Sequence, residues 1–258
     1  PLKITKKELI EKLGDAVSKS EICEDSLVLN KLNLDSNLFK KGYYIIQDEA
    51  SALVASSIGL PLDKKYKILD TCAAPGGKSL HIASKYFNSS LISCDKYIHK
   101  LKLIEDNKEK LGITNIEVKE QDATLNNTSF NNKFDIVICD VPCSGIGVIK
   151  NKPEIKYKIT NSYVEDIAKL QYDILENSKK YVKQEGILMY STCTIDKREN
   201  IENIEKFLKE NKDFSLESIS LNNSIVKTRD NGVLEILPDE YSCDGFFIAK
   251  LKKMEEKC

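Results

Sequence analysis

"YKILDTCAAPGGKSLHIASKYF" (residues 66–87) contains the order of elements that decides the fold. The apolar run at 66–72 predicts a short strand, and the pattern at 76–87 predicts a helix. Small residues, a proline and two glycines separate them. A strand that passes through a glycine-containing turn into a helix is typical of α/β proteins, in which such units repeat around one sheet.

The same alternation continues on both sides of this stretch. Further strands are expected at 90–95, 116–122, 134–140, 186–193 and 244–253, and further helices at 47–59, 97–111, 162–183 and 197–211. The strands are continuous apolar runs, which indicates a parallel sheet buried on both faces. Residues 1–45 are weakly patterned, with a strand expected at 2–5 and a helix at 6–13. We interpret 1–45 as a small N-terminal α+β appendage and 46–258 as one α/β domain.

Composition limits the classes of function. Hydrophobic residues make up 41% of the 258 residues and the formal net charge is −1, so a large core is expected and any basic surface must be local. No apolar run approaches the length of a membrane span. Eight cysteines without a CxxC pair indicate reduced thiols in a cytoplasmic protein. Cys139 and Cys143, with only His81 and His99 available as further ligands, do not favour zinc, and we expect no metal.

Unusual polar clusters follow most of the predicted strands. They are residues 70–79, Asp95, Asp122, 140–145 and 191–194. Because ligands of parallel α/β sheets bind beyond the carboxyl ends of the strands, these clusters predict one site at that edge.

The glycine turn at 70–79 is tested against three ligand types. A P-loop would need glycine where Cys72 stands, and a dinucleotide fingerprint would need spaced glycines rather than adjacent ones. The small residues of the turn instead suit a nucleoside cofactor without a pyrophosphate. Asp95 could bind its ribose hydroxyls and Asp122 an exocyclic amine, which together suit S-adenosyl-L-methionine. The alternative is that Asp95 and Asp122 are helix caps or turn residues.

Two thiols, Cys143 and Cys193, follow predicted neighbouring strands. Asp140-Val-Pro-Cys lacks the aromatic residue of the related D-P-P-Y motif, which shifts the expectation from nitrogen to carbon methylation. Carbon 5 of a pyrimidine is a poor nucleophile until a thiolate adds to carbon 6, so a cysteine is a chemical requirement for that reaction. The residues alone leave open which thiol attacks. The remaining cysteines are interpreted as small buried hydrophobic residues: Cys23, Cys72, Cys94, Cys139, Cys243 and Cys258.

From about residue 40 to its end, the sequence resembles the Nop/Sun family of RNA cytosine-5 methyltransferases. The motifs that carry the resemblance are QDEASAL (47–53), DTCAAPGGKS (70–79), DVPCSGIGVIKNKPEIKY (140–157), STCTIDKREN (191–200) and DGFFIAKL (244–251). One departure is the basic pair Lys197 and Arg198 before Glu199 and Asn200. The resemblance implies a Rossmann-like class I S-adenosylmethionine-dependent methyltransferase fold, mostly parallel with an antiparallel last strand.

The resemblance also implies roles for residues. Cys193 is similar to the nucleophile of the family, Cys143 to the thiol that assists product release, and Asp140 to the residue that contacts the cytosine. The implied cofactor contacts are Cys72, Ala73, Ala74, Pro75, Gly76, Gly77, Lys78, Asp95, Asp122 and Asp140. The expected reaction forms 5-methylcytosine in RNA, with small-subunit 16S ribosomal RNA as the leading substrate and transfer RNA or another ribosomal position as the alternative. A non-catalytic ribosome-assembly factor is a further alternative.

A basic loop follows Cys143 and is the predicted RNA contact, formed by Lys150, Lys152, Lys156 and Lys158. The alternative is a solvated loop in a lysine-rich chain. Lys6, Lys7, Lys40 and Lys41 could extend the surface. Relatives usually have a separate helical N-terminal domain similar to NusB that this chain does not contain, so weak RNA binding by this chain alone is expected. We expect a monomer.

Overall fold

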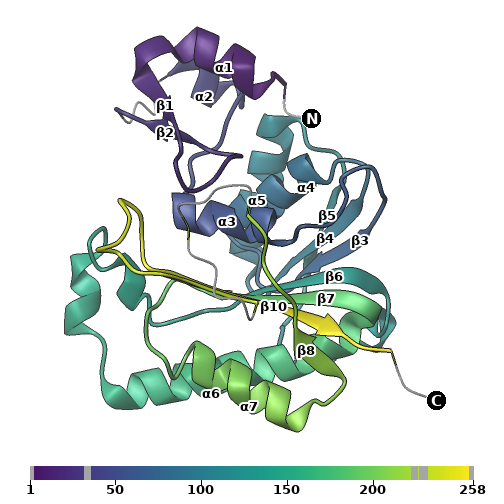
Figure 1. Cartoon of the computed structure of the whole chain (residues 1–258). Helices are drawn as coiled ribbons and strands as arrows, with labels where there is room; N and C mark the ends of the chain where they lie inside the picture. The colour runs from purple at the N-terminus through teal and green to yellow at the C-terminus, as the bar shows by residue number, and fades with distance from the viewer. Residues whose placement is uncertain (1–2, 32–35, 222–225, 227–231, 256–258) are drawn as a thin grey trace.

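The structure, a computed structural model, describes residues 3–31, 36–221, 226 and 232–255 (Figure 1). Its central element is an eight-stranded sheet in the order β5-β4-β3-β6-β7-β10-β8, with β9 paired to β10. The strands are β3 Lys67–Asp70, β4 Ser90–Asp95, β5 Ile116–Glu120, β6 Phe134–Asp140, β7 Val182–Thr192, β8 Phe214–Leu216, β9 Val233–Ile236 and β10 Phe246–Lys253.

Strands β3 to β7 pair in parallel, whereas β10 is antiparallel to β7, β8 and β9. This arrangement confirms the expected mostly parallel Rossmann-like sheet with an antiparallel last strand. The short edge strands β8 and β9 were not expected from the sequence. They pair with different halves of β10, at Leu251–Lys253 and Phe246–Ala249 respectively.

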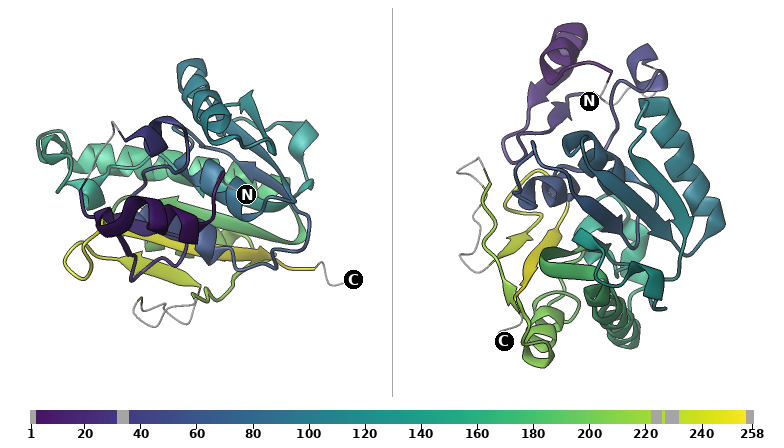
Figure 2. Two further views of the ribbon diagram at one scale, coloured as in Figure 1. Left: turned by 90° about the horizontal axis from the view of Figure 1, so that it is seen from above. Right: turned by 90° about the vertical axis from the view of Figure 1, so that its right-hand side faces the viewer.

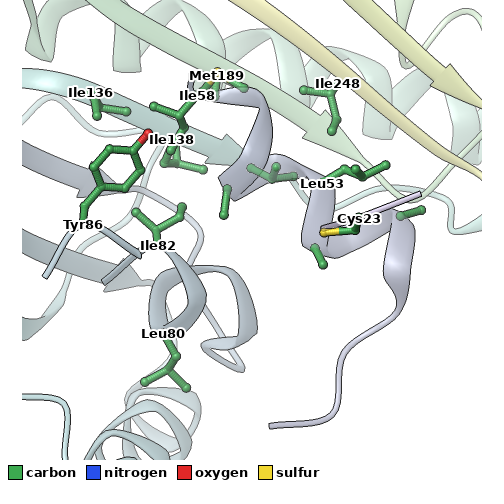
Figure 3. Close-up of a cluster of buried hydrophobic side chains, with 14 of the residues drawn as sticks. Cys23, Leu53, Ile58, Leu80, Ile82, Tyr86, Ile136, Ile138, Met189 and Ile248 are labelled. Carbon is green, nitrogen blue, oxygen red and sulfur yellow. The ribbon is translucent and has the colours of Figure 1, made fainter. Parts of the chain in front are cut away.

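Helices cover both faces of the sheet (Figure 1, Figure 2). They are α3 Glu49–Ser57, α4 Gly77–Lys85 and α5 Ile98–Leu111 on one face, and α6 Asn161–Ser178 and α7 Ile201–Glu210 on the other. Successive residues of each strand point alternately to the helices on one face and to those on the other. The strand residues on both faces are therefore apolar. Figure 3 shows Leu53 and Ile82 from the helices packed with Ile138, Met189 and Ile248 from the strands. Full burial of such side chains stabilises by about 1.5–3 kcal/mol each, which makes the sheet a rigid platform for the site.

Several predicted boundaries were wrong by a few residues, for local reasons. Helix α3 begins at Glu49 because Asp48 caps it, accepting from the backbone N–H groups of Ala50 and Ser51. The helix expected at 162–183 ends at Ser178, because one 3-10 turn (η5, Lys179–Tyr181) leads directly into β7. The helix expected at 197–211 begins at Ile201, since residues 197–200 form turns.

The N-terminal segment (residues 3–42) contains α1 Lys6–Leu13, the strand pair β1 Val17–Lys19 and β2 Leu27–Leu29, and α2 Asn37–Lys40, and lies beside α3, α4 and α5 (Figure 1). Helix α1 is as expected, but residues 3–5 of the strand expected at 2–5 are not a strand, and Leu2 lies outside the described residues. A cavity of about 410 Å³ lies between the segment, residues 43–49 and the side of α4 that carries Leu80, His81 and Ser84. Asp25 crosses this boundary to bond Ser56 at 2.8 Å and Lys85 at 2.5 Å. The segment is therefore joined to the domain partly through polar contacts.

Within the ranges that the structure describes, no helix combines the length and apolar character needed to cross a bilayer. Three further single-turn 3-10 helices occur in loops: η2 Thr128–Phe130, η3 Ile146–Val148 and η4 Pro153–Tyr157. A fourth, η1 Gly14–Ala16, follows α1.

Candidate active site

The predicted site residues gather at the carboxyl ends of β3, β4, β6 and β7. Strands β3 and β6 are neighbours, although β4 and β5 lie between them in the sequence. The direction in which strands are added therefore reverses next to β3, and open α/β sheets bind ligands at such a point. Asp70 ends β3 and Asp140 ends β6, the two neighbouring strands at which the direction reverses.

The turn after β3 (residues 71–76) is fixed by its own backbone. The N–H of Ala73 donates to Cys94 O at 2.7 Å, and the N–H of Gly76 donates to Ala73 O at 2.7 Å. Gly76 has φ +105°, and a Cβ there would lie 3.2 Å from Cγ1 of Ile104. Glycine is required here both for the conformation and for the close approach of α5. The turn delivers the chain into the N-terminus of α4.

A buried hydrogen-bond chain supports this turn from below. Ser93 Oγ donates to Ser79 Oγ at 2.8 Å, and Ser79 Oγ donates to Asp70 Oδ2 at 2.6 Å. Asp70 is fully buried, and burial raises its pKa to about 7, against the lowering effect of the bond from Ser79. Burial also raises the pKa of the Cys72 thiol well above its ordinary value, so this thiol is not a reactive thiolate.

Asp95 and Asp122 end the next two segments along the edge. The carboxylate of Asp95 accepts from the N–H of Tyr97 at 3.0 Å and of Ala74 at 3.3 Å, which ties the turn to β4. Asp122 pairs with Lys96 at 2.8 Å, and this bond holds the pKa of Asp122 down, to about 2. Both carboxylates thus make the local bonds of turn residues, and Asp95 also contacts the turn after β3 through Ala74. Their cofactor roles remain predictions.

The two thiols meet, because β6 and β7 are parallel neighbours whose ends carry them. Cys143 Sγ and Cys193 Sγ are 3.1 Å apart, and both cysteines are free. The hydrogen bond with Cys143 lowers the pKa of Cys193, against the opposing effect of burial. The same bond, together with burial, raises the pKa of Cys143 well above its ordinary value. The arrangement favours a thiolate at Cys193 and a protonated thiol at Cys143 as its hydrogen-bond donor.

One ion pair connects the turn and the thiols. Lys78 Nζ, on the first turn of α4, lies 2.7 Å from Asp140 Oδ2, and the hydroxyl of Ser191 donates to Asp140 Oδ1 at 2.8 Å. Burial lowers the pKa of Lys78, but the charge of Asp140 outweighs it and the net shift is upward. Lys78 Nζ also lies 5.2 Å from the centre of the Phe246 ring. Lys78 therefore stays charged and helps to lower the pKa of Cys193.

The predicted RNA-binding lysines of the loop after β6 are all exposed: Lys150, Lys152, Lys156 and Lys158. Tyr157, which is 81% exposed, lies 4.9 Å below Nζ of Lys156. Asn151 fastens the loop to Asp244 with a bond of 2.8 Å. In contrast, Lys6 donates to the carbonyls of Glu24 and Ser26, so this lysine stabilises the N-terminal segment itself.

Sequence reasoning missed several residues that shape the site. The sequence analysis did not single out Ser191, Phe246, Ser144 and Gln171, although the first three lie inside the quoted motifs.

The other described cysteines are buried or half-buried, and Cys258 lies outside the described residues. Among the residues that the structure describes, no three His, Cys, Asp or Glu side chains are grouped to hold a metal ion.

The parallel sheet with its antiparallel last strand, and the site at the switch point, define a Rossmann-like fold of the class I methyltransferase type. The family model described as "16S rRNA methyltransferase RsmB/F" matches residues 58–252, so the chain belongs to this family and the resemblance to Nop/Sun proteins is confirmed.

Known relatives support this assignment. A probable ribosomal RNA small subunit methyltransferase B from Bacillus subtilis is 39% identical, over 98% of this chain and 58% of the relative. The crystal structure of PH0851 has a TM-score of 0.87 and 31% identity, over 97% of this chain and 57% of that one. The crystal structure of NSun6 from Pyrococcus horikoshii with SFG has a TM-score of 0.74 and 30% identity, over 89% and 58%. The chain thus spans little more than half the length of these proteins.

Proposed function

We propose that the protein transfers a methyl group from S-adenosylmethionine to carbon 5 of a cytosine in small-subunit ribosomal RNA, through a covalent adduct with Cys193. The observation that carries this proposal is the pair of thiols, 3.1 Å apart, with opposite pKa shifts. A thiolate is the form that adds to carbon 6 of the pyrimidine ring. The names of the relatives support ribosomal RNA as the substrate.

The residues at the turn fit the cofactor. Ala73, Ala74, Gly76 and Gly77 have at most a methyl side chain, so a nucleoside can approach their backbone. The carboxylates of Asp95 and Asp122 would bind its hydroxyl and amine groups. When bound, S-adenosylmethionine supplies an electrophilic methyl group. Lys78 and Asp140 lie between the turn and the thiols, where the methionine end would lie.

The protein's part in the reaction follows from the thiol geometry. Cys193 Sγ forms a bond to carbon 6 of the cytosine, which gives carbon 5 the electrons that take up the methyl group. Asp140 accepts a hydrogen bond from the exocyclic amine and orients the base. A base then removes the proton at carbon 5, the bond between Sγ and carbon 6 breaks, and the electron pair returns to sulfur as the thiolate. The thiol proton of Cys143 stabilises this departing thiolate.

We expect a monomer, and the reaction on ribosomal RNA implies a cytoplasmic protein. The exposed lysines after Cys143 would hold phosphates around a base turned out of its helix. The aromatic ring of Tyr157 on the same loop offers a surface on which a neighbouring base could stack.

The test uses this chain in excess over RNA at low salt, with methyl-labelled S-adenosylmethionine. Small-subunit ribosomal RNA that lacks 5-methylcytosine, large-subunit RNA and transfer RNA are compared, and the products are digested to nucleosides for mass spectrometry. We expect 5-methylcytidine from the small-subunit RNA. Label in 5-methyluridine or in a nitrogen-methylated nucleoside would refute the chemistry, and 5-methylcytidine only in transfer RNA would refute the substrate.

A further inference from the structure

Glu199 is a fully buried carboxylate in the turn between β7 and α7. It accepts four hydrogen bonds. Its Oε2 accepts from the N–H of Ser144 at 2.8 Å and from Nε2 of Gln171 at 2.8 Å. Its Oε1 accepts from the hydroxyl of Ser144 at 2.5 Å and of Thr194 at 3.2 Å. The donors come from the loop after β6, from α6 and from the end of β7, so one side chain joins three segments.

Two of the donor residues, Ser144 and Thr194, are the neighbours of the two thiols in the sequence. Ser144 follows Cys143, and Thr194 follows Cys193. The hydroxyls of Ser144 and Thr194 are themselves 2.9 Å apart. Glu199 therefore adds side-chain bonds to the backbone bonds that join the two segments, which run from the N–H of Val141 to Ser191 O and from the N–H of Gly147 to Cys193 O.

Cys143 is held from its other side as well. Nε2 of Gln171 donates both to Glu199 and to the carbonyl of Pro142, the latter at 2.9 Å. Cys143 thus lies between Pro142 and Ser144, which are bonded to Gln171 and Glu199, near the start of a long loop whose outer part faces solvent. Without these bonds the loop would still be joined to Cys193 through the N–H of Gly147. The peptide groups on both sides of Cys143 would lose their partners, however, and its thiol would be freer to move away from Cys193.

We propose that Glu199 is a positioning residue that holds Cys143 so that its thiol donates to Cys193, both in the resting enzyme and when the product leaves. The proposal rests on the proposed function for the step of product release, but its geometric content does not depend on the identity of the RNA.

The charge of Glu199 acts in the same direction as its hydrogen bonds. A buried negative charge beside Cys143 contributes to the raised pKa of that thiol and so keeps its proton in place. The other groups that face the pair are Lys78, which lowers the pKa of Cys193, Asp140, which raises it, and the buried hydroxyl of Tyr190. An amide at position 199 can keep its oxygen toward the N–H of Ser144 and Nε2 of Gln171, but its NH2 group then donates to the hydroxyls of Ser144 and Thr194 instead of accepting from them. Glutamine therefore keeps the shape of the side chain, loses two accepted bonds and removes the negative charge beside Cys143.

The test compares the wild-type chain with Glu199→Gln and with the control Glu202→Gln, which changes an exposed carboxylate on the adjoining first turn of α7. The rate at which iodoacetamide alkylates Cys193 is followed against pH, with the modified peptide identified by mass spectrometry. We expect the midpoint for Cys193 to rise by about one pKa unit in Glu199→Gln, which is an approximately tenfold loss of thiolate at neutral pH. The control should keep the wild-type profile.

A folded Glu199→Gln protein with the wild-type profile would overturn the proposal, because a purely structural glutamate would leave the thiol pKa unchanged. Circular dichroism shows whether the variant folds. If it does not, Ser144→Ala decides instead, since it removes a single bond to Glu199, and an unchanged profile in that folded variant also overturns the proposal.

The alkylation needs no RNA, so it tests Glu199 even if ribosomal RNA is not the substrate. With an RNA that forms the adduct, Glu199→Gln should also lengthen the lifetime of the adduct relative to Glu202→Gln. A failure to form any adduct with the wild-type chain would count against the proposed function and leave the alkylation result standing.

Discussion

The turn after β3 (residues 71–76) and the loop after β6 (residues 141–160) leave adjacent parallel strands, yet they are held in different ways. The turn is short, and backbone bonds to β4 and within itself fix it. The loop is long, and its first residues are held by backbone bonds to Ser191 and Cys193 together with the side chains of Glu199 and Gln171. Its outer part carries exposed lysines.

The difference corresponds to the two tasks that we propose. The cofactor always has the same structure, so a rigid turn that already has its binding conformation is suited to bind it. A base presented by a folded RNA is served by a loop with an anchored thiol at one end and an adaptable basic surface at the other. The ion pair of Lys78 and Asp140 is the direct connection between the two regions.

Loss of the ion pair between Lys78 and Asp140 should reduce the rate of methyl transfer more than any of the three changes that follow. Lys78→Met leaves the charge of Asp140 uncompensated and removes a cation that lowers the pKa of Cys193. We expect methyl transfer in a single turnover to fall by about 100-fold at neutral pH, and its pH profile to move to higher pH. The control Lys102→Met changes an exposed lysine on α5. If the pH profile of methyl transfer in Lys78→Met is the same as in the wild type, Lys78 does not act on Cys193, and the proposed connection between the two regions is wrong.

The rigid turn should be sensitive to a single methyl group. Gly76→Ala places a Cβ at φ +105° and 3.2 Å from Ile104. We expect a loss of about 1–3 kcal/mol in the free energy of unfolding and a weaker affinity for S-adenosylmethionine, measured by calorimetry. Gly14→Ala is the matched control, since Gly14 also has a positive φ but no atom within 4 Å of the added Cβ. It should lose stability without losing cofactor affinity, and equal cofactor loss in both variants would contradict the account.

The buried Asp70 should make stability depend on pH. Its folded pKa of about 7 is above the unfolded value of about 3.9, so between these values the native state holds more protons than the unfolded state. Stability contributed by this group is therefore present at low pH and is lost as the pH rises from about 4 to 7. In Asp70→Asn this part of the dependence should disappear from denaturant unfolding curves, while the exposed control Asp63→Asn should keep it. An unchanged slope in Asp70→Asn would mean that Asp70 is ionised in the folded protein.

Single changes in the basic loop should have the smallest effect. Lys156→Ala is expected to weaken RNA binding only a few-fold and to reduce the slope of log K against log salt by about 0.7–0.9, without changing cofactor affinity. Lys64→Ala, an exposed lysine in the loop before β3, is the control. If both variants have the same salt slope as the wild type, the loop after β6 does not hold phosphates.

The contrast between the two regions also explains what the sequence could predict. The turn, with Gly76 and the entry to α4, is signalled by contiguous residues, so the stretch at 66–87 was sufficient to predict it, although its bond to Cys94 and its contact with Ile104 lie outside that stretch. The meeting of Cys143 and Cys193 followed from the order of the strands. Glu199 was noticed only as part of a motif, because nothing in its neighbours along the chain indicates that it is buried against Ser144, which precedes it by 55 residues.

Short strands were the other feature that the sequence could not predict. Strands β8 and β9 have three and four residues, too few for an apolar period to be recognised, and they form because β10 offers them an edge. The start of β7 at Val182 was missed because Lys183, Gln184 and Glu185 give that end of the strand a polar pattern.

The central claim is that Cys193 attacks and Cys143 releases. It is tested by mixing small-subunit ribosomal RNA and S-adenosylmethionine with the wild type, Cys143→Ala, Cys193→Ala and the control Cys23→Ala, and by looking for a protein–RNA band that resists denaturant. The account predicts that the band accumulates in Cys143→Ala, is absent in Cys193→Ala and is as faint in Cys23→Ala as in the wild type. A band that accumulates in Cys193→Ala and is absent in Cys143→Ala would contradict it and exchange the roles of the two thiols.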